Sequence, residues 1–570
     1  MSWELSTLGE FTARARRSAV FARNGMVASS QPYASEIGLS VLKSGGNAVD
    51  AAIAVAAALA VTEPCSTGLG GDCFLLYYEA ATRQVHALNG SGRAPAALTR
   101  ERAVAGLGLA AGAPEPSSLP SHDVNCVTVP GSAAGWADAV SRWGSQPLSR
   151  VLEPAARLAE EGFPVQPLTA LQWRNGEKQL RRGPHFGELM VGGGGGGGGE
   201  PRAPRAGEVF SNPGMARTLR ELGAGGARAF YEGRAGRAIV DVLRAPGGTM
   251  ELSDLAAHAS SFPEPLSVRY GDVEVFEVGP NGQGIAALMA LNVLEAMRRE
   301  GAGVAAMRPL GAQVLHTQIE AMRLAFADAR AFVADPDCVP VPVRGMLDAA
   351  YAAQRRALID PARARADVSA GSPQHGSDTV SFQVVDARGN AVSMVNSNYE
   401  GFGSGIVPHG CGFTLQNRGA NFSLRAEHPN VVAPRKRPFH TIIPAIVLHA
   451  DTRELFATLT NMGGFMQPSG HVQLVCNLVD FKMDPQAAID APRFCVTDGE
   501  GNSQIALEDG VDADVARQLQ AMGHRIMLDG QTLKGHQRSL FGRAQIILRK
   551  RATGVLAAGS DGRADGAAMG

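Results

Sequence analysis

This sequence has few of the features that indicate a membrane protein, a metal site or a secreted protein with disulfides. The 7 cysteines are scattered, form no CxxC pair and have no metal-ligand spacing. An odd, dispersed set of this kind also differs from a secreted disulfide framework. The longest apolar run covers residues 51–61, whereas a membrane-spanning helix needs roughly 20 residues. The first residues, MSWELSTLGEFTARARRS, lack the apolar stretch of a signal peptide, so we expect a cytoplasmic protein with no membrane partner.

The sequence also lacks a dominant charge. Its formal net charge is -1, so no global field would attract nucleic acid, and we expect a small-molecule partner instead. Hydrophobic residues make up 45% and charged residues 19%, a balance that excludes a disordered chain. Because 570 residues exceed one ordinary hydrophobic core, we expect two domains or two interleaved halves.

Two helices are indicated near the N-terminus. The first runs from about Ala34 to Lys43 and ends at a Gly-Gly pair. Asn47 then caps a second helix, with Asp50 three residues further on. The sequence that follows, AVDAAIAVAAALAV, is apolar almost all round, which predicts a helix buried on several sides.

Further along, helical character returns at 285–299 and 314–334. Residues 92–125 are rich in Ala, Pro and Gly and read as surface connections. The glycine run 192–199 predicts a flexible insertion.

A change from loop to strand occurs at Thr379. Residues 361–378 have neither helical nor strand periodicity and predict an exposed loop. TVSFQVVD then alternates like a strand, RGN predicts a turn, and AVSMVNSN reads as the returning strand. Helices early in the chain and strands here are typical of a layered α/β protein.

The position of Thr379 would suit an N-terminal nucleophile. A hydroxyl needs a base beside it. If the Asp378-Thr379 bond were cut, the new α-amine would lie next to the threonine hydroxyl, and an α-amine has an ordinary pKa of about 7.7–8.0. One residue would then supply both nucleophile and base. By position alone, the favoured explanation of Thr379 is an ordinary β-branched strand residue, because threonine is enriched in strands.

A set of motifs in a fixed order favours the first interpretation. The run DTVSFQVVDARGNAVS…GFGSGIV resembles the start of the small subunit of gamma-glutamyltransferases, also called gamma-glutamyltranspeptidases or glutathione hydrolases. The other motifs are GGNAVDAAIA (45–54), GLGGDCF (68–74), GRAPA (92–96), VPGSAAGW (129–136), EAMRLAFADAR (320–330), KRPFHTIIP (436–444), MGGF (462–465), APRF (491–494) and GSDGRADG (559–566).

The resemblance implies a fold and a maturation step. The fold would be α/β, a four-layer αββα N-terminal-nucleophile hydrolase sandwich. Self-cleavage would divide the chain into a large fragment, 1–378, and a small fragment, 379–570, which remain together as a heterodimer, with a dimer of these as a further possibility. The enzyme would cleave an amide through an acyl-threonine intermediate and would need no cofactor and no metal.

The resemblance also implies catalytic roles. Thr379 would be the nucleophile, and Ser397 the second hydroxyl that supports it. Gly463 and Gly464 would form the oxyanion hole with their backbone N–H groups, because a residue without Cβ lets the backbone approach a ligand. The alternative for this glycine pair is an ordinary turn after the strand ELFATLT.

Arg93 matches the arginine that binds the substrate α-carboxylate in the family. A guanidinium suits this task because its planar fork grips a carboxylate through two parallel hydrogen bonds. Without the resemblance, Arg93 would read as a solvated loop arginine.

Several substrate positions depart from the family pattern. The carboxylate that grips the substrate amine is replaced by Asn421, an Asn by Tyr399 and a Gln by Arg418. A serine pair becomes His440-Thr441, in which His440 would be either a substrate contact or a satisfied core histidine. An uncharged Asn421 should recognise an ammonium group less strongly, while Arg93 and Arg418 together would suit a dicarboxylic acyl group.

At these positions the sequence is similar to a glutathione-hydrolase-like branch of the family. That branch also has cephalosporin-acylase-like and oxamate-amidohydrolase-like members. Hydrolysis of γ-glutamyl or related acyl amides is therefore expected over transfer to an amino acid, with a transpeptidase proper as the alternative. An uncleaved pseudoenzyme is the non-enzyme alternative.

Three other motifs carry weaker signals. GPNGQGIAA (279–287) mimics a dinucleotide fingerprint but lacks the preceding βαβ context. GLGGD lacks the Lys-Ser/Thr of a phosphate loop. His316 and Glu320 are spaced HxxxE, which is not a zinc motif and reads as a helix pair.

Overall fold

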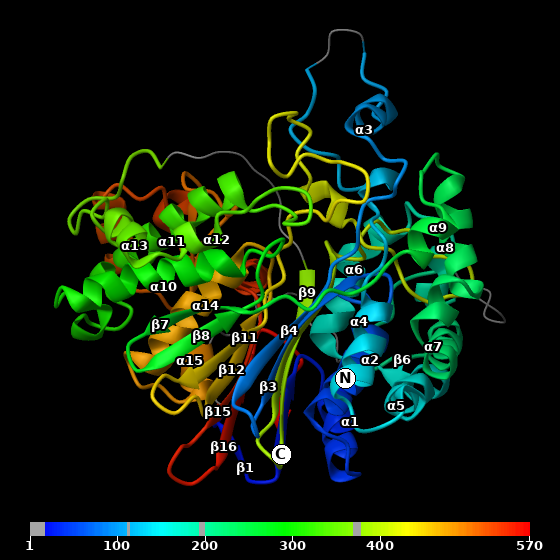
Figure 1. Cartoon of the computed structure of the whole chain (residues 1–570), viewed down its shortest axis with the longest axis horizontal. Coiled ribbons are helices and arrows are strands. Elements are labelled where there is room, and N and C mark those ends of the chain that lie inside the picture. The colour runs from blue at the N-terminus through cyan, green and yellow to red at the C-terminus, as the bar shows by residue number, and fades with distance from the viewer. Residues whose placement is uncertain (1–16, 111–113, 193–199, 369–377) are drawn as a thin grey trace.

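Two antiparallel β-sheets packed face to face form the centre of the molecule (Figure 1). The structure is a computed structural model that describes residues 17–110, 114–192, 200–368 and 378–570, together with the backbone but not the side chains of Asp378 and Thr379. Most of the predicted glycine insertion (193–199) and half of the predicted loop before Thr379 (369–377) lie outside the described residues.

Each sheet takes strands from both ends of the chain. In sheet order, the six-stranded sheet consists of β17 (Ala567–Met569), β2 (Gly25–Ser29), β9 (Asp378–Asp386), β10 (Ala391–Tyr399), β3 (Asp72–Glu79) and β4 (Gln84–Gly90). The seven-stranded sheet consists of β1 (Val20–Ala22), β16 (Leu556–Ser560), β15 (Ala544–Arg549), β12 (Leu455–Asn461), β11 (Ala445–His449), β8 (Val273–Glu277) and β7 (Leu266–Tyr270).

Both faces of each sheet are buried. Along β3, Phe74 and Leu76 face the core between the sheets, whereas Leu75 and Tyr77 face the helices outside. This alternation follows from the period of two in a strand. The core between the sheets is completed by side chains of the other sheet, such as Ile446.

Helices cover the outer face of each sheet, as Figure 1 shows on its two sides. The helices over the six-stranded sheet include α1 (Pro32–Lys43), α2 (Ala48–Thr62), α4 (Ser132–Trp143), α5 (Leu148–Glu161) and α7 (Pro213–Tyr231). Those over the seven-stranded sheet include α10 (Gly284–Arg299), α11 (Ala312–Phe332), α14 (Met466–Val479) and α15 (Pro485–Asp490). The predicted four-layer α/β sandwich is confirmed.

The remaining elements connect these layers. They are α3 (Arg100–Gly106), α6 (Pro167–Leu180), α8 (Arg234–Arg244), α9 (Leu252–Ala256), α12 (Val343–Met346), α13 (Ala349–Arg356), α16 (Ala513–Ala521), β5 (Phe163–Pro164), β6 (Val209–Phe210), β13 (Phe494–Val496) and β14 (Ile505–Leu507). Short 3₁₀ turns include η2 (Val124–Cys126), η5 (Arg418–Asn421) and η7 (Gly535–Phe541).

Helix α2 confirms two predictions from its sequence. The Asn47 side chain accepts hydrogen bonds from the backbone N–H groups of Val49 and Asp50, and the Asp50 carboxylate accepts one from the backbone of Asn47. This is a reciprocal capping box. Every residue of α2 is buried, because the helix lies between β9 and β10 on one side and α1, α4 and α5 on the others.

The prediction for residues 92–125 was wrong in part. The segment contains α3 and the start of η2, and its Leu98 and Ala103 pack with Cys126 and Phe422 into a small apolar cluster of their own. Because the segment is rich in Ala, Pro and Gly, its sequence did not predict the short helix α3. The first helix begins two residues earlier than expected, because Pro32 suits the first helical position. Within the described ranges, no helix is long and apolar enough to cross a membrane.

The junction at Thr379 does not separate two domains. The predicted fragments 1–378 and 379–570 both contribute strands to both sheets, with β2 and β3 of the first fragment paired to β9 and β10 of the second. The two halves are interleaved, which is one of the two arrangements that the chain length predicted. A cut at this junction would leave the interstrand hydrogen bonds in place.

Candidate active site

The strand pair β9–β10 has a β-bulge at the start of β9. The register shifts between Asn396 and Tyr399, so two residues of β10, Ser397 and its neighbour, lie opposite Thr379. Tyr399 ends the bulge with φ +80°, a left-handed conformation that costs a bulky residue of order 1–3 kcal/mol. Bulges and strain of this kind are over-represented beside active sites, where they re-aim side chains.

Ser397 is held from two directions. Its Oγ accepts a hydrogen bond from the backbone N–H of Tyr399 at 2.9 Å and another from the guanidinium of Arg418 at 3.0 Å. The same guanidinium donates to Oγ1 of Thr441 at 2.6 Å. Arg418 thus fixes the relative positions of two hydroxyl groups from separate segments.

Arg418 carries a buried positive charge. Its side chain is completely buried and its guanidinium lies over the Tyr399 ring, 4.5 Å from the ring centroid. Burial lowers the pKa of Arg418 to about 10, against the opposing charge of Asp72, so the group stays protonated near neutral pH. Among the described residues no carboxylate forms an ion pair with it, and Nε has no hydrogen-bond partner.

His440 forms a buried pair with Asp72. The two side chains meet at 3.0 Å between Nε2 and Oδ2, and the backbone N–H of Ile442 reaches Nδ1 at 3.4 Å. Burial, together with the positive charge of Arg418, lowers the pKa of His440 to about 4 against the opposing effect of Asp72. The imidazole is therefore neutral, with the proton on Nε2. Because it is buried with both nitrogens engaged, the geometry favours the core-histidine interpretation of His440.

The glycine pair lies between β12 and α14. Gly463 has φ +120° and Gly464 has φ +60°, conformations that favour glycine. A Cβ on Gly463 would meet the backbone of Gly542 at 3.0 Å. Within the described part of the chain, neither backbone N–H has a hydrogen-bond acceptor. Two adjacent unsatisfied donors are what an oxyanion hole requires.

Gln283 links the glycine pair to the hydroxyl groups. Its Nε2 donates to the backbone carbonyls of Thr441 at 2.6 Å and Gly464 at 2.9 Å. A continuous chain of contacts therefore runs from the bulge opposite Thr379 through Ser397, Arg418, Thr441 and Gln283 to Gly464.

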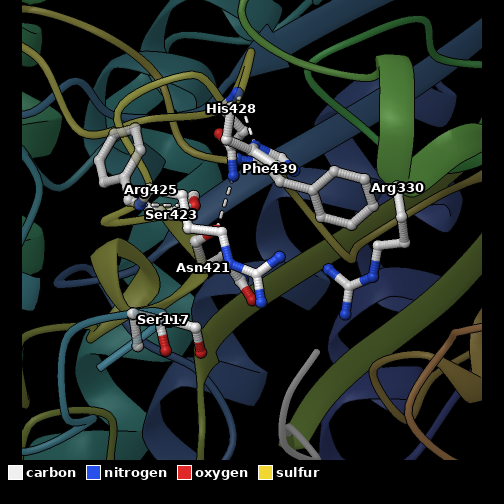
Figure 2. Close-up of a pocket in the computed structure, with 11 residues that line it drawn as sticks. Ser117, Arg330, Asn421, Ser423, Arg425, His428 and Phe439 are labelled. Atoms are coloured by element: carbon white, nitrogen blue, oxygen red, sulfur yellow. Dashed lines mark hydrogen bonds between the residues drawn. The ribbon is translucent and has the colours of Figure 1, made fainter. Parts of the chain in front are cut away.

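Tyr399 connects this chain to a small pocket. Its buried hydroxyl donates to Oδ1 of Asn421 at 2.8 Å, and burial raises the pKa of Tyr399 well above its usual value. Asn421 lines the pocket shown in Figure 2, and its Nδ2 is buried without a hydrogen-bond partner. Arg330 and Arg425 also line this pocket.

Arg93 is engaged by protein carboxylates. Its guanidinium donates to Asp335 at 2.9 Å and to Asp337 at 2.5 Å, and also to the backbone carbonyl of Arg435 at 3.0 Å. The half-exposed side chain is therefore not the solvated loop arginine of the alternative interpretation. In this structure its donors are directed at the two acids.

A second cavity, of about 400 Å³, lies beyond Tyr399, where Glu400 and Gly401 face α6 and η7. Its cationic lining residues, Arg538 and Arg563, both pair with the buried carboxylate of Glu508. The charges of this cavity are thus balanced within the protein.

Three site residues were missed from the sequence. Asp72 is the last residue of the GLGGD turn, Gln283 lies in the segment that resembled a dinucleotide fingerprint, and Arg330 ends the EAMRLAFADAR motif. The sequence motifs had identified the segments that contain these three residues, but not what the residues do. Their roles depend on contacts with residues more than 100 positions away, such as Asp72 with His440, which no local pattern signals.

Comparison with known proteins identifies the family. The family described as Gamma-glutamyltranspeptidase matches residues 34–570. The chain is 35% identical over 552 residues to the glutathione hydrolase-like YwrD proenzyme of Bacillus subtilis (strain 168), covering 96% of this chain and 98% of the relative. It is 32% identical over 561 residues to the oxamate amidohydrolase proenzyme of Klebsiella pneumoniae, with 96% and 98% covered.

Among solved structures, a cephalosporin acylase from Bacillus halodurans superposes with a TM-score of 0.86 at 40% identity, covering 98% of this chain and 97% of that one. The sandwich described above is thus the N-terminal-nucleophile hydrolase fold of these proteins. The protein belongs to the gamma-glutamyltranspeptidase family and is a proenzyme amidohydrolase of that family.

Proposed function

We propose that this protein cuts itself between Asp378 and Thr379 and then hydrolyses γ-glutamyl or related acyl amides through an acyl-Thr379 intermediate. The observation that carries the proposal is the chain of contacts from Ser397 to Gly464, which joins the bulge opposite Thr379 to two unsatisfied backbone donors. Nucleophile, supporting hydroxyl and oxyanion donors are the parts that acyl transfer needs.

Each step has an assigned group. The α-amine of Thr379 takes the proton of its own hydroxyl, and Oγ attacks the amide carbonyl carbon. The N–H groups of Gly463 and Gly464 stabilise the negative charge that develops on the carbonyl oxygen. The C–N bond then breaks, the amine leaves with the proton, and an ester to Thr379 remains. Water attacks this ester with the same α-amine as base, which releases the carboxylic acid and restores the hydroxyl.

In this scheme Arg418 is a positioning residue. Its guanidinium is occupied by the hydroxyl groups of Ser397 and Thr441, so it orients them and adds a positive charge close to the reaction. His440, neutral and bonded to Asp72, supports the segment that carries Thr441.

This chain differs from a γ-glutamyl-transferring enzyme in the residues that would contact the acyl group of the substrate. Asn421 stands where the family pattern has a carboxylate, and its side-chain acceptor Oδ1 already receives the Tyr399 hydroxyl. The atom left without a partner is the donor Nδ2. A donor suits an anionic oxygen rather than an ammonium group. We therefore favour hydrolysis of acyl amides without strict need for a free α-amine, and place γ-glutamyl transpeptidation second.

Self-cleavage is the first test. Denaturing electrophoresis of the purified protein should show two fragments, and N-terminal sequencing of the smaller one should begin at Thr379. Thr379→Ala should abolish cleavage and turnover, whereas Thr379→Ser should keep part of both, because hydroxyl and amine remain. A stable, uncut wild-type chain would instead support the pseudoenzyme.

A substrate panel separates the two enzyme activities. Processed protein should turn over glutaryl amides, which lack the amine, at least as well as glutathione. Robust transfer from glutathione to a dipeptide acceptor, with little hydrolysis of glutaryl amides, would favour the transpeptidase.

A further inference from the structure

Two histidines and a glutamate that the proposed reaction does not use lie together at the protein surface. His185, Glu188 and His409 each offer one ligand atom, and these atoms all lie within 4.8 Å of one another. The two imidazole rings meet edge to face, with their centroids 4.8 Å apart and an angle of 67° between the ring planes. Among the described residues, no other three histidine, cysteine or carboxylate side chains gather in this way.

The carboxylate of Glu188 is held in place by the loop that carries His409. Its Oε1 accepts a hydrogen bond from the backbone N–H of Gly410 at 2.6 Å, and its Oε2 accepts one from the backbone N–H of Gly412 at 3.1 Å. An ionised carboxylate has about four acceptor sites, so both oxygens can still bind a further group. Hydrogen bonds of this kind are typical of carboxylates that ligate a metal, because they orient the ligand.

The loop itself is fixed against the start of α7. The Asn212 side chain, which caps α7, donates to the backbone carbonyl of Gly412 at 2.8 Å. A Cβ on Gly412 would lie 2.1 Å from Oδ1 of Asn212, so the approach is too close for any other residue. Arg234 donates to the backbone carbonyl of Gly410 at 2.8 Å. His409 therefore projects from a backbone whose next residues are held on both sides.

His185 is brought to the same place by a tight turn. It directly precedes the 3₁₀ turn η3 (Phe186–Leu189) and has φ +58°, in the left-handed region. Histidine is one of the few residues other than glycine that adopt this conformation fairly often. The backbone N–H of Glu188 donates to the carbonyl of His185 at 3.0 Å, which closes the turn and keeps the two residues adjacent in space.

The two imidazoles are not engaged by other protein groups. Both His185 and His409 are exposed, and within the described part of the chain neither ring has a hydrogen-bond or ion-pair partner besides the contact between the two rings. Their ring nitrogens are therefore available to a metal ion without the loss of a protein contact. The half-buried carboxylate of Glu188 would supply the negative charge next to that ion.

This set of donors favours a transition metal ion over calcium or magnesium. Two imidazoles and a carboxylate suit Zn²⁺, with ligand distances of about 2.0–2.2 Å, whereas Ca²⁺ and Mg²⁺ prefer oxygen atoms alone. Neighbouring ligand atoms of a tetrahedral zinc site lie about 3.3 Å apart, so these atoms have to approach by roughly 1.5 Å at most. Rotation of the exposed imidazoles supplies that movement, and water would complete the coordination.

The three ligands come from both sides of the predicted cut. His185 and Glu188 belong to the fragment 1–378, and His409 belongs to the fragment 379–570, where it lies between β10 and η5. A metal ion held by all three would therefore form a direct bond to each fragment. Such a bond would add to the interstrand hydrogen bonds that hold the fragments together.

We propose that His185, Glu188 and His409 bind a divalent transition metal ion, with zinc as the probe, and that this ion bridges the two fragments of the processed protein. Metal binding itself is independent of the proposed reaction, and only the bridging of two separate chains rests on the proposed self-cleavage. The ion has a structural role and takes no part in acyl transfer.

Zinc binding is measured by calorimetry on full-length protein that has been treated with a chelator and carries no histidine tag. The wild type should bind one zinc ion per protein, and excess magnesium should not displace it. His409→Gln and His185→Asn should each weaken zinc binding by about tenfold or more, since even the loss of a group that only orients a ligand costs about 10–100-fold. Asparagine is used at position 185 because it tolerates the left-handed backbone.

His122→Gln is the matched control. His122 is also an exposed histidine, but it belongs to no group of metal ligands among the described residues, so this variant should bind zinc like the wild type. Equal zinc affinity in His409→Gln, His185→Asn and wild type would overturn the proposal. A wild type that binds no zinc at micromolar concentrations would overturn it as well.

The bridge is measured separately, on processed protein. Zinc should raise the urea concentration at which the two fragments separate in size-exclusion chromatography, and His409→Gln should remove this effect. Bound zinc that leaves the separation unchanged would refute the bridge.

The uncut variant Thr379→Ala separates this proposal from the proposed function, because it should bind zinc as tightly as the wild type. Zinc binding through His409 in a wild type that never cuts itself would refute self-cleavage and leave the metal site standing. Self-cleavage and amide hydrolysis in a protein that binds no zinc would refute the metal site and leave the hydrolase standing.

Discussion

Replacing Gly463 by alanine is a direct test of the oxyanion role. Two separate penalties can be calculated. The residue has φ +120°, and forcing a residue with Cβ into such a conformation costs of order 1–3 kcal/mol. The new Cβ would lie 3.0 Å from the backbone of Gly542, so the turn must also shift. A shift moves the N–H group, and losing one oxyanion donor raises the barrier by about 2.7–4 kcal/mol.

The expected result is therefore a fall in kcat of about 10²–10³-fold, with a moderate loss of thermal stability. Turnover of an acyl-p-nitroanilide and the rate of self-cleavage are both measured, because the precursor uses the same donors if the proposal is right. Thermal unfolding gives the structural cost on the same samples.

Gly389→Ala separates the two penalties. Gly389 also has a left-handed φ, +86°, but a Cβ there would meet only Ala80 Cβ at 3.6 Å, and the residue lies in the β9–β10 turn at the far end of the hairpin. This variant should lose stability and keep kcat. If Gly463→Ala behaved like Gly389→Ala, with stability reduced and kcat unchanged, the Gly463 N–H would not be an oxyanion donor.

Three further predictions concern residues around this centre. Asn421→Asp should shift the ratio of kcat/KM toward substrates with a free α-amine by about tenfold, because a charge-assisted contact replaces a neutral one; an unchanged ratio of glutathione to glutaryl turnover would argue against contact at this position. The folded-state pKa of His440, about 4, lies below its ordinary 6.5, so stability that is complete above about pH 6.5 should be lost as the pH falls toward 4, by up to about 3 kcal/mol. His440→Gln should flatten that part of a pH-dependent unfolding curve, and an unaltered slope would contradict the buried neutral state. Gln283→Leu removes the donor to the carbonyls of Thr441 and Gly464 and should lower kcat by about tenfold with little change in KM; a change in KM alone would place Gln283 in binding instead.

Local features could be read from the sequence because their causes are local. The capping box at Asn47 depends on residues three apart, and α2 is buried because its own residues are apolar on every side. Thr379 could be assigned to the start of a strand because alternation begins there. The order of motifs along the chain identified the family, and with it the four-layer sandwich, without any knowledge of distances.

Local composition failed where tertiary contacts override it. Residues 92–125 looked like connections, yet Leu98 and Ala103 share an apolar cluster with Phe422, more than 290 positions away. His440 remained open between two roles until its partner Asp72, from the other proposed fragment, was placed beside it.

The arginines give the clearest division between what sequence and structure decide. The sequence predicted that Arg93 and Arg418 occupy family substrate positions, because the order of motifs assigns each residue a position along the chain. Only the tertiary structure decided that Arg93 faces Asp335 and Asp337 and that Arg418 holds two hydroxyl groups. It also decided that Arg330 and Arg425 line one pocket, whose described lining residues include no carboxylate. Whether a charge is free for a ligand depends on which groups the fold brings within a few ångströms, and that is set by packing between distant segments rather than by spacing within one.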